Sequence, residues 1–371
     1  MHDEKNHKIG EMSKECFLEH HYTMKSRNNL HVVSFNPKTH TEEQINEMLT
    51  KKMENSEIKN FQKQEKNQLY RRTVTFNDPG YSQQWHLHQT PHLSDVGVEA
   101  VWEQGIFGQG VVVSIIDDGI DHNHPDIAPN YLPLASYDVN YQDSDPEATS
   151  YEVHGTEAAG TVGAAANNHY CGVGVAPSAS LAAIRLLSEQ TEDWEEAEAL
   201  QYRNDIVDIY SNSWGPYDDG IHIQGPGPLT LAALEDSTLH GRAGLGNIYI
   251  WAAGNGKSVN DNINYDGYAN SRFSITVGAI GYDGTSPYYS EPGAPLLITA
   301  PSSDGSHSIY TSGFGSACKT NFGGTSAAWF VSFPFFFSIL SITNLPSSSL
   351  SSSFFLSIVL WLLVLLLCAW K

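Results

Sequence analysis

The chain has 371 residues, of which 40% are hydrophobic, and this length allows one large domain or two around a sizeable core. It carries 42 acidic residues against 20 lysines and arginines, and residues 73–371 hold 31 of the acidic ones but only 7 of the basic ones. A field this negative excludes nucleic acid as a partner and favours cationic ligands or metal ions, although a solvated acidic surface would give the same count.

The composition divides the chain into three zones. Residues 1–72 are polar, rich in lysine and glutamate, and show no secretory signal at the start, so we expect a protein that is not secreted or a true start that is missing. Residues 73–328 have the composition of a globular domain. Residues 329–371 are rich in serine, phenylalanine and leucine, and their last apolar stretch, residues 354–370, has 17 residues, the short limit for a membrane span.

Five apolar runs in the central zone predict strands that alternate with helical or glycine-rich segments. They cover residues 111–116, 181–187, 206–214, 247–255 and 273–280. Such alternation is typical of α/β architecture. The first run is β-branched and nearly unbroken, which indicates a strand of a parallel sheet buried on both faces.

Two carboxylates, Asp117 and Asp118, directly follow this first strand. The carboxyl end of a strand in an open α/β sheet is where binding sites are built, because loops leave the rigid scaffold there. The next residue is glycine, and Asp-Gly is also a common turn dipeptide. A functional carboxylate and a simple turn are both compatible with this segment.

Three further segments carry polar groups that could act on a substrate. His154 opens "HGTEAAGTVG", which predicts a closely packed helix, and an imidazole there could serve as a general base. Asn255 follows an apolar strand in "WAAGNG". Ser326 follows two glycines and a threonine at a predicted helix start, where its hydroxyl would need a base to become a nucleophile. The histidine and the serine could each be structural when taken alone.

In the order Asp, His, Ser, these segments resemble the subtilisin-like serine proteases, or subtilases. Within that family the kexin/furin-like proprotein convertases are most similar, through "DDGIDHNHPDI", "YDVNYQDSDP", "IYSNSWGPYDDG", "GLGNIYIWAAGNG" and "YDGYANS". The resemblance covers about residues 77–328. It implies an α/β, subtilisin-like three-layer fold with a mostly parallel central sheet that is incomplete at the carboxyl end.

The resemblance implies a calcium-dependent serine endopeptidase that cleaves precursor proteins after paired basic residues. Ser326 would attack the scissile carbonyl while His154 takes its proton, and Asp117 would hold the imidazole. Asn255 would donate to the oxyanion. Four acidic side chains and one tyrosine would line the pockets for the basic residues of the substrate. They are Asp118, Glu196, Asp218, Asp266 and Tyr268.

Two positions near these pockets depart from the convertase pattern. Gln224 stands where the family usually has an acidic residue. Residues before His154 are deleted, which leaves Glu152 as the only nearby carboxylate. We therefore expect a preference for Lys-Arg or Arg-Arg with a weaker demand further upstream in the substrate.

The resemblance also implies bound calcium, because hard cations take carboxylate, amide and backbone oxygens as ligands. Any one of the three candidate groups could instead be an acidic turn. The first group is Asp78 and Asp126 with the loop positions Ala165, Asn168, Tyr170 and Gly172; the second is Asp218, Asp261 and Glu291; the third is Asp138, Asp143 and Asp145.

Four cysteines allow three pairings if all are bonded, and they could instead all be buried or free thiols. The resemblance suggests a disulfide between Cys171 and Cys318, which implies an oxidising compartment, here the secretory pathway. Cys16 and Cys368 have no evident partners.

The two ends of the chain carry separate expectations. Residues 1–72 resemble an inhibitory propeptide that would bind its own protease domain and be released by cleavage after Arg72. After Ser326 the family continues with small residues and a proline, whereas Trp329 and Phe330 stand here. This change suggests a truncated or misread gene model, and a genuine membrane-associated tail is the alternative. A chain that could not position its serine would be at most a binding module.

Overall fold

The structure is a computed structural model, and it divides into two compact units, Met1–Arg71 and Arg72–Lys371. It describes residues 18–23, 31–36, 38–55, 58–59, 61, 74–88 and 95–331.

The first unit contains an antiparallel pair of strands and one helix. β1 (Leu18–Thr23) pairs with β2 (His31–Phe35), and α2 spans Glu42–Glu54. Thr41 caps α2 through a reciprocal capping box: its hydroxyl accepts from the backbone N–H of Gln44, whose side chain accepts from the backbone N–H of Thr41.

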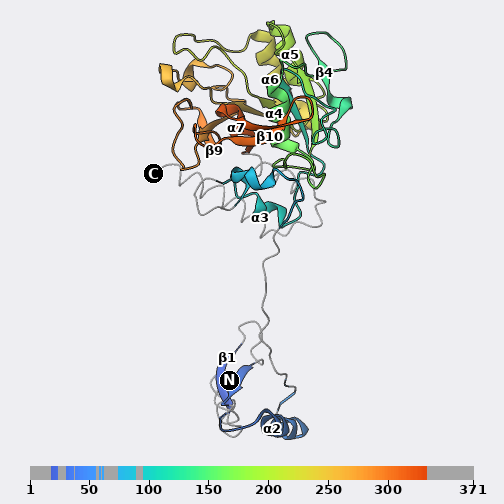
Figure 1. The fold of residues 1–371 in the computed structure, drawn as a ribbon, viewed down its shortest axis with the longest axis vertical. Helices are drawn as coiled ribbons and strands as arrows, with labels where there is room; N and C mark the ends of the chain where they lie inside the picture. Colours follow the sequence, from blue (N-terminus) through green and yellow to red (C-terminus); the bar gives the residue numbers. More distant parts are fainter. Residues whose placement is uncertain are drawn as a thin grey trace. The chain divides into compact units, whose positions relative to one another are not determined.

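A seven-stranded sheet, parallel at every pairing between its strands, forms the centre of the second unit (Figure 1). This confirms the predicted α/β architecture with a mostly parallel central sheet. The strand order is β4-β5-β3-β6-β7-β8-β9. The strands are β3 (Val112–Asp117), β4 (Tyr137–Asp138), β5 (Ser180–Arg185), β6 (Ile209–Asn212), β7 (Ile248–Ala252), β8 (Ser274–Ile280) and β9 (Leu296–Pro301).

The five predicted runs contain β3, β5, β6, β7 and β8, apart from one residue at the end of β3 and one at the start of β5. The sequence pattern did not predict β4 and β9, which lie at the two edges of the sheet. β4 has only two residues, and β9 ends in a proline, which reads as a break in a strand pattern. The runs that were recognised are therefore those of the sheet interior.

Helices cover both faces of this sheet and make three layers. They are α3 (Glu99–Trp102), α4 (His154–Gly163), α5 (Asp193–Gln201), α6 (Pro228–Gly244) and α7 (Gly324–Val331). Ala158 of α4 and Ala327 of α7 belong to one hydrophobic core, whereas Leu200 of α5 and Leu234 of α6 belong to another. The small side chains of α4 and α7 allow these two helices to pack closely against the sheet and each other.

β3 contributes to both cores, which explains its unbroken apolar sequence. Val113 and Ile115 face one core and Ile116 faces the other, and all three are fully buried. Asp117, at the end of the strand, is 2% exposed. The carboxyl ends of the parallel strands meet at one edge of the sheet, so the polar residues that follow them gather there.

A hairpin leads the chain into α7. β10 (Ile309–Gly313) pairs antiparallel with β11 (Ala317–Phe322), and β10 packs against α4. A disulfide joins Cys318 of β11 to Cys171 in the loop after α4, with a Cα–Cα distance of 5.4 Å. The segment just before Ser326 is thereby tied to the segment that follows the His154 helix.

Candidate active site

Asp117 and His154 come from adjacent elements at the carboxyl edge of the sheet. Asp117 ends β3, and His154 is the first residue of α4, as its sequence predicts. His154 Nδ1 lies 2.8 Å from Asp117 Oδ2 and 3.0 Å from Oδ1, within hydrogen-bond distance of both oxygens. The Asp117 side chain is 3% exposed and that of His154 36%. The carboxylate thus holds the ring at Nδ1 and leaves Nε2 for proton exchange.

Gly155 permits this close approach. A Cβ at Gly155 would lie 2.2 Å from the backbone oxygen of Gly119 and 3.0 Å from Asp117 Cβ. Any larger residue would push the start of α4 away from the end of β3. The glycine after His154 is therefore explained by packing against the Asp117 loop.

The charges around His154 favour its protonated form. Burial by itself would lower the pKa of His154, but nearby carboxylates, with Asp117 foremost, raise it to about 9. Such an imidazole takes up a proton readily, as a general base must, and it loses that proton only when the pH approaches this value.

Asp118 caps the start of α4. Its Oδ2 accepts from the backbone N–H of His154 at 3.1 Å, and its Oδ1 accepts from that of Gly155 at 2.7 Å. Burial and the neighbouring Asp117 raise the pKa of Asp118 to about 7 in spite of these bonds. The sequence assigned Asp118 to substrate and did not foresee the capping role. Its partial burial is compatible with both.

Asn255 fixes the turn that carries Ser326. Its Oδ1 accepts from the backbone N–H of Thr325 at 2.8 Å and from the Thr325 hydroxyl at 3.1 Å. This bonding leaves the amide NH2 of Asn255 as a donor. Ser326 directly follows Thr325 and is 7% exposed in the first turn of α7. No hydrogen bond joins Ser326 to His154 among the described residues. Bonds of this kind often tighten only when substrate is bound.

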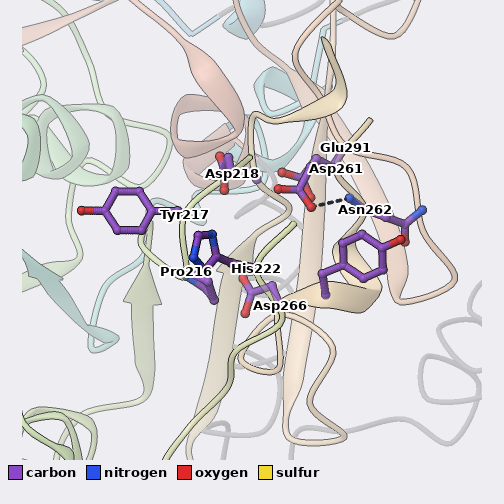
Figure 2. A pocket seen from close by; sticks show the side chains of 10 residues that line it. Pro216, Tyr217, Asp218, His222, Asp261, Asn262, Asp266 and Glu291 are labelled. Atoms are coloured by element: carbon purple, nitrogen blue, oxygen red, sulfur yellow. Dashed lines mark hydrogen bonds between the residues drawn. The ribbon is translucent and has the colours of Figure 1, made fainter. Parts of the chain in front are cut away.

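Four carboxylates line a pocket beside Asn255 (Figure 2). Carboxylate oxygens of Asp218, Asp261 and Glu291 lie within 4.8 Å of one another, and Asp266 lines the same pocket. Asp218 Oδ2 accepts from the backbone N–H of Asn255 at 2.6 Å. A carboxylate of the acidic pocket is therefore bonded to the backbone of Asn255, the residue whose side chain is the predicted oxyanion donor.

Three of these carboxylates have raised pKa values. Burial, reinforced by the neighbouring negative charges, raises the pKa of Glu291 to about 8 and that of Asp266 to about 7, and the pKa of Asp218 is raised as well. A bound cation would relieve this repulsion, and three converging carboxylates are ligands that suit calcium. The group Asp218, Asp261 and Glu291 therefore fits the predicted second calcium site.

Comparison with known proteins decides the family. The model of the subtilase family matches residues 108–328, more than half of the chain, and this range contains Asp117, His154, Asn255 and Ser326. The chain belongs to the subtilase family.

The curated relatives of this subtilase chain are proprotein convertases. Proprotein convertase subtilisin/kexin type 7 from Homo sapiens is 44% identical over 269 residues, which cover 70% of this chain and 34% of that protein. Furin-like protease 1, isoform 1-CRR, from Drosophila melanogaster is 43% identical over 261 residues, which cover 69% of this chain and 24% of that protein. The subtilase chain thus spans about a third or less of the length of these two relatives.

Solved structures confirm the subtilisin-like fold. The serine protease of Aeromonas sobria superimposes with a TM-score of 0.64 at 22% identity, covering 73% of this chain and 56% of that one. A cold adapted subtilisin-like serine proteinase superimposes with a TM-score of 0.53 at 19% identity, covering 70% of this chain and 85% of that one. At such identities the comparison speaks for the fold alone.

Hydrogen bonds tie two carboxylates of the first predicted calcium group to Asn168. Asp78 accepts from the backbone N–H groups of Asn167 and Asn168, and Asp126 Oδ1 accepts from Asn168 Nδ2 at 2.8 Å. Both carboxylates are buried, at 4% and 0% exposure. Carboxylate oxygens are the kind of ligand that calcium takes. The same loop carries the other predicted ligand positions, Ala165, Tyr170 and Gly172.

The third predicted group does not assemble in the same way. Asp138, Asp143 and Asp145 are not among the groups of three described side chains whose ligand atoms lie within 4.8 Å of one another. Asp138 forms a buried ion pair with Arg185 at 2.8 Å, and Asp145 lies 3.0 Å from His122. Because Arg185 already neutralises Asp138, a cation gains less from that carboxylate.

The ion pairs of Arg185 were not predicted from the sequence. Besides Asp138, Arg185 binds Glu152, the carboxylate that precedes His154. Its Nη2 lies 2.8 Å from Glu152 Oε1, so Arg185 bridges Glu152 and Asp138. Burial opposes ionisation of Glu152, but the neighbouring Ser188, the N–H of Thr149 and the ion pair with Arg185 lower its pKa to about 2. An arginine inside an apolar strand was the available signal for a buried ion pair.

Two of the remaining predicted substrate residues, Glu196 and Tyr268, bond to each other, and a third, Asp266, contacts Gln224. The Tyr268 hydroxyl donates to Glu196 Oε2 at 2.7 Å. Gln224 forms an isolated parallel bridge with Asp266, so the position that departs from the convertase pattern borders the acidic pocket.

A second ion pair near His154 was also missed. Glu157 lies one turn after His154 on α4 and is 5% exposed, and Lys319 Nζ of β11 lies 2.8 Å from Glu157 Oε1. The partners are far apart in sequence, so no local pattern connects them.

Several predictions fall on residues that the structure does not describe. Cys16, Cys368, Arg72 and the apolar segment 354–370 lie outside the described residues. Among the described helices, none combines the length and apolar content that a membrane crossing requires. α7 runs through the positions of Trp329 and Phe330 and ends at Val331.

Proposed function

We propose that this chain carries a calcium-dependent serine endopeptidase domain of the kexin/furin type, which cleaves precursor proteins after paired basic residues. The observation that carries the proposal is the bond between Asp117 and His154, at the same edge of the sheet where Asn255 holds the residue before Ser326. Relatives named as proprotein convertases and a furin-like protease support the same reading.

The reaction would proceed by acyl transfer. Ser326 Oγ attacks the scissile carbonyl and gives its proton to His154 Nε2, while Asp117 stabilises the imidazolium at Nδ1. The oxyanion accepts a hydrogen bond from the amide of Asn255. His154 then protonates the leaving amine, and a water molecule hydrolyses the acyl-enzyme by the same proton route in reverse.

Acidic side chains near the triad would select basic residues. Asp266 with Asp218 would receive the residue before the cut, and Asp118 the residue before that. Burial leaves these carboxylates with raised pKa values, so a lysine or arginine side chain that enters the pocket gains a charge-assisted hydrogen bond and removes a like-charge repulsion. Glu196 and Tyr268 would contact a more remote basic residue.

Two clusters of carboxylate side chains would each hold a calcium ion. Bound calcium would supply positive charge to Asp218, Asp261 and Glu291. Asp218 would then remain ionised while it accepts from the backbone N–H of Asn255. Calcium binding would therefore also stabilise the backbone of Asn255, the proposed oxyanion donor. The second cluster is that of Asp78 and Asp126.

The disulfide and the terminal regions suggest where the enzyme works. The Cys171–Cys318 disulfide supports an oxidising compartment, and we place the protein in the secretory pathway. Residues 1–72 would act as its propeptide and first partner. Segment 354–370 would associate with a membrane.

Fluorogenic peptides provide the test. The purified full chain should cleave peptides ending in Arg-Arg or Lys-Arg, and it should lose this activity in a calcium chelator and in the Ser326→Ala variant. A fluorophosphonate probe should label Ser326 in the parent chain only. Equal cleavage after Leu-Leu would refute the specificity, and a folded chain that takes no label would be a binding module instead.

A further inference from the structure

A second cluster of metal-binding side chains contains an imidazole. His122 Nε2 lies 3.0 Å from Asp145 Oδ1 and 2.9 Å from Glu147 Oε2. Among the described residues, this cluster and the group around Asp218 are the ones that bring three ligand atoms within 4.8 Å of one another. The His122 cluster is separate from the triad and from the acidic pocket in its residues.

One nitrogen cannot satisfy both carboxylates. His122 Nε2 carries at most one hydrogen, so it can donate a well-aligned bond to Asp145 or to Glu147 but not to both at once. Both carboxylates nevertheless converge on this atom. A metal ion bound to the unprotonated Nε2 would be shared by all three side chains, which a proton cannot be.

The backbone and a ring stack hold the imidazole and one carboxylate in place. The His122 ring stacks on Tyr131, with centroids 4.6 Å apart and planes 10° apart. Ile120 forms a parallel bridge with Glu147, and its N–H donates to the backbone oxygen of Pro146 at 3.0 Å. Two of the three ligands are therefore positioned before any ion arrives, which lowers the entropy cost of binding.

We propose that His122, Asp145 and Glu147 form a site for a zinc-class divalent cation, with water completing its coordination. One imidazole and two carboxylates suit zinc, whereas calcium takes oxygen ligands alone. Tetrahedral zinc with bonds of about 2.0–2.2 Å places its ligand atoms roughly 3.3–3.6 Å apart. The two distances from His122 Nε2, 3.0 and 2.9 Å, therefore need to lengthen by about 0.3–0.7 Å. The Asp145 side chain, 71% exposed, has room for this movement.

The proposed ion would join two segments next to the catalytic edge. His122 lies shortly after Asp117 and Asp118, and Glu147 lies on the segment that pairs with Ile120. Binding would stabilise the loop that leaves β3. It would also engage Asp145, a member of the third predicted calcium group, in a different site. The inference does not depend on proteolytic activity.

Cobalt absorption tests the site without an activity measurement. The full chain with Ser326→Ala, which prevents self-cleavage, should bind Co²⁺ with the visible bands of a low-symmetry nitrogen and oxygen environment. Zn²⁺ should abolish these bands and excess Ca²⁺ should leave them. His122→Gln should remove them, and Glu147→Gln, which keeps the side-chain shape, should weaken Co²⁺ binding by at least ~10-fold.

His240→Gln is the matched control. His240 is an exposed histidine that lies 2.8 Å from one carboxylate, that of Asp236, so its loss should leave the bands unchanged. Circular dichroism on each variant establishes that the domain is folded. Bands that persist in folded His122→Gln, or that disappear when Ca²⁺ is added, would overturn the zinc-class assignment.

Discussion

Asn255 Oδ1 accepts from Thr325, and the amide NH2 of the same side chain would be the proposed oxyanion donor. Asn255→Asp separates the two roles, because it keeps an oxygen that accepts from Thr325 but removes the amide donor. We expect kcat to fall by about 10²–10³-fold with KM little changed, because only the transition state uses the donor.

Initial rates on an Arg-Arg peptide would measure this effect. Asn255→Ala is the companion variant, since it loses the Thr325 contact as well and should therefore also unfold at a lower temperature. An Asn255→Asp enzyme with undiminished kcat would show that this amide does not stabilise the oxyanion.

Glu157, which pairs with Lys319, contributes to the raised pKa of His154. Glu157 is one of the carboxylates that raise the pKa of His154 to about 9. Activity requires neutral His154, so kcat/KM of the parent should fall as the pH drops below this raised pKa rather than below the ordinary value of about 6.5. Glu157→Gln removes one negative charge and should move the fall to lower pH by about half a unit.

A pH profile of kcat/KM checks both statements. Glu235→Gln is the control, because Glu235 forms an exposed ion pair with Arg272 and lies on α6, which packs on the other face of the sheet. If Glu157→Gln left the pH at which kcat/KM falls unchanged, or raised it, this role of Glu157 would be contradicted.

At the level of elements, the disulfide is the contact with the largest expected effect. It links β11 to the loop after α4 across 147 residues of sequence. Cys171→Ser with Cys318→Ser should lower the free energy of unfolding by about 2–5 kcal/mol, since the unfolded chain regains the freedom that the crosslink removes.

Urea denaturation of the Ser326→Ala chain would measure this loss. Cys16→Ser with Cys368→Ser is the matched control and should leave the midpoint unchanged. A midpoint that moved equally in both double variants would show that the Cys171–Cys318 link adds no stability of its own.

Periodicity and strand-end chemistry predicted the elements that carry the candidate site. β3 leads to Asp117, His154 opens α4, and Ser326 lies in the first turn of α7, all as the local sequence indicated. The family resemblance also implied two contacts between distant segments, Asp117 with His154 and Cys171 with Cys318. Ion pairs between distant segments were not predictable, because residue type alone does not name a partner. Asp138 illustrates this: it looked like a calcium ligand, but Arg185 from β5 neutralises it.

For the molecule as a whole, part of the excess of acidic over basic residues gathers in one pocket. The sequence predicted that the excess charge after residue 72 would attract cations, and part of it converges in the pocket of Asp218, Asp261, Asp266 and Glu291. The remainder includes isolated surface pairs such as Asp205 with Arg203. The charge count is therefore compatible with bound cations and with a solvated acidic surface, and it does not identify which carboxylates would bind a cation.

That pocket should make the stability of the domain depend on both pH and calcium. Folded-state pKa values of about 8 for Glu291 and about 7 for Asp266 lie above the values near 4 expected in the unfolded chain. Between about pH 4 and pH 8 the folded state therefore binds more protons than the unfolded state. The free energy of unfolding then falls as the pH rises through this window. The depressed pKa of Glu152 acts only below it.

Calcium should reverse this trend, because a cation bound by Asp218, Asp261 and Glu291 would displace the protons that the carboxylates with raised pKa values otherwise take up. Unfolding temperatures of the Ser326→Ala chain, measured between about pH 5 and pH 8, should fall with pH in a chelator and stay level or rise with calcium. Asp266→Asn should flatten the fall in chelator, since it removes one of the raised carboxylates. If the slopes with chelator and with calcium were the same, no cation would be linked to this pocket, and burial alone would account for its raised pKa values.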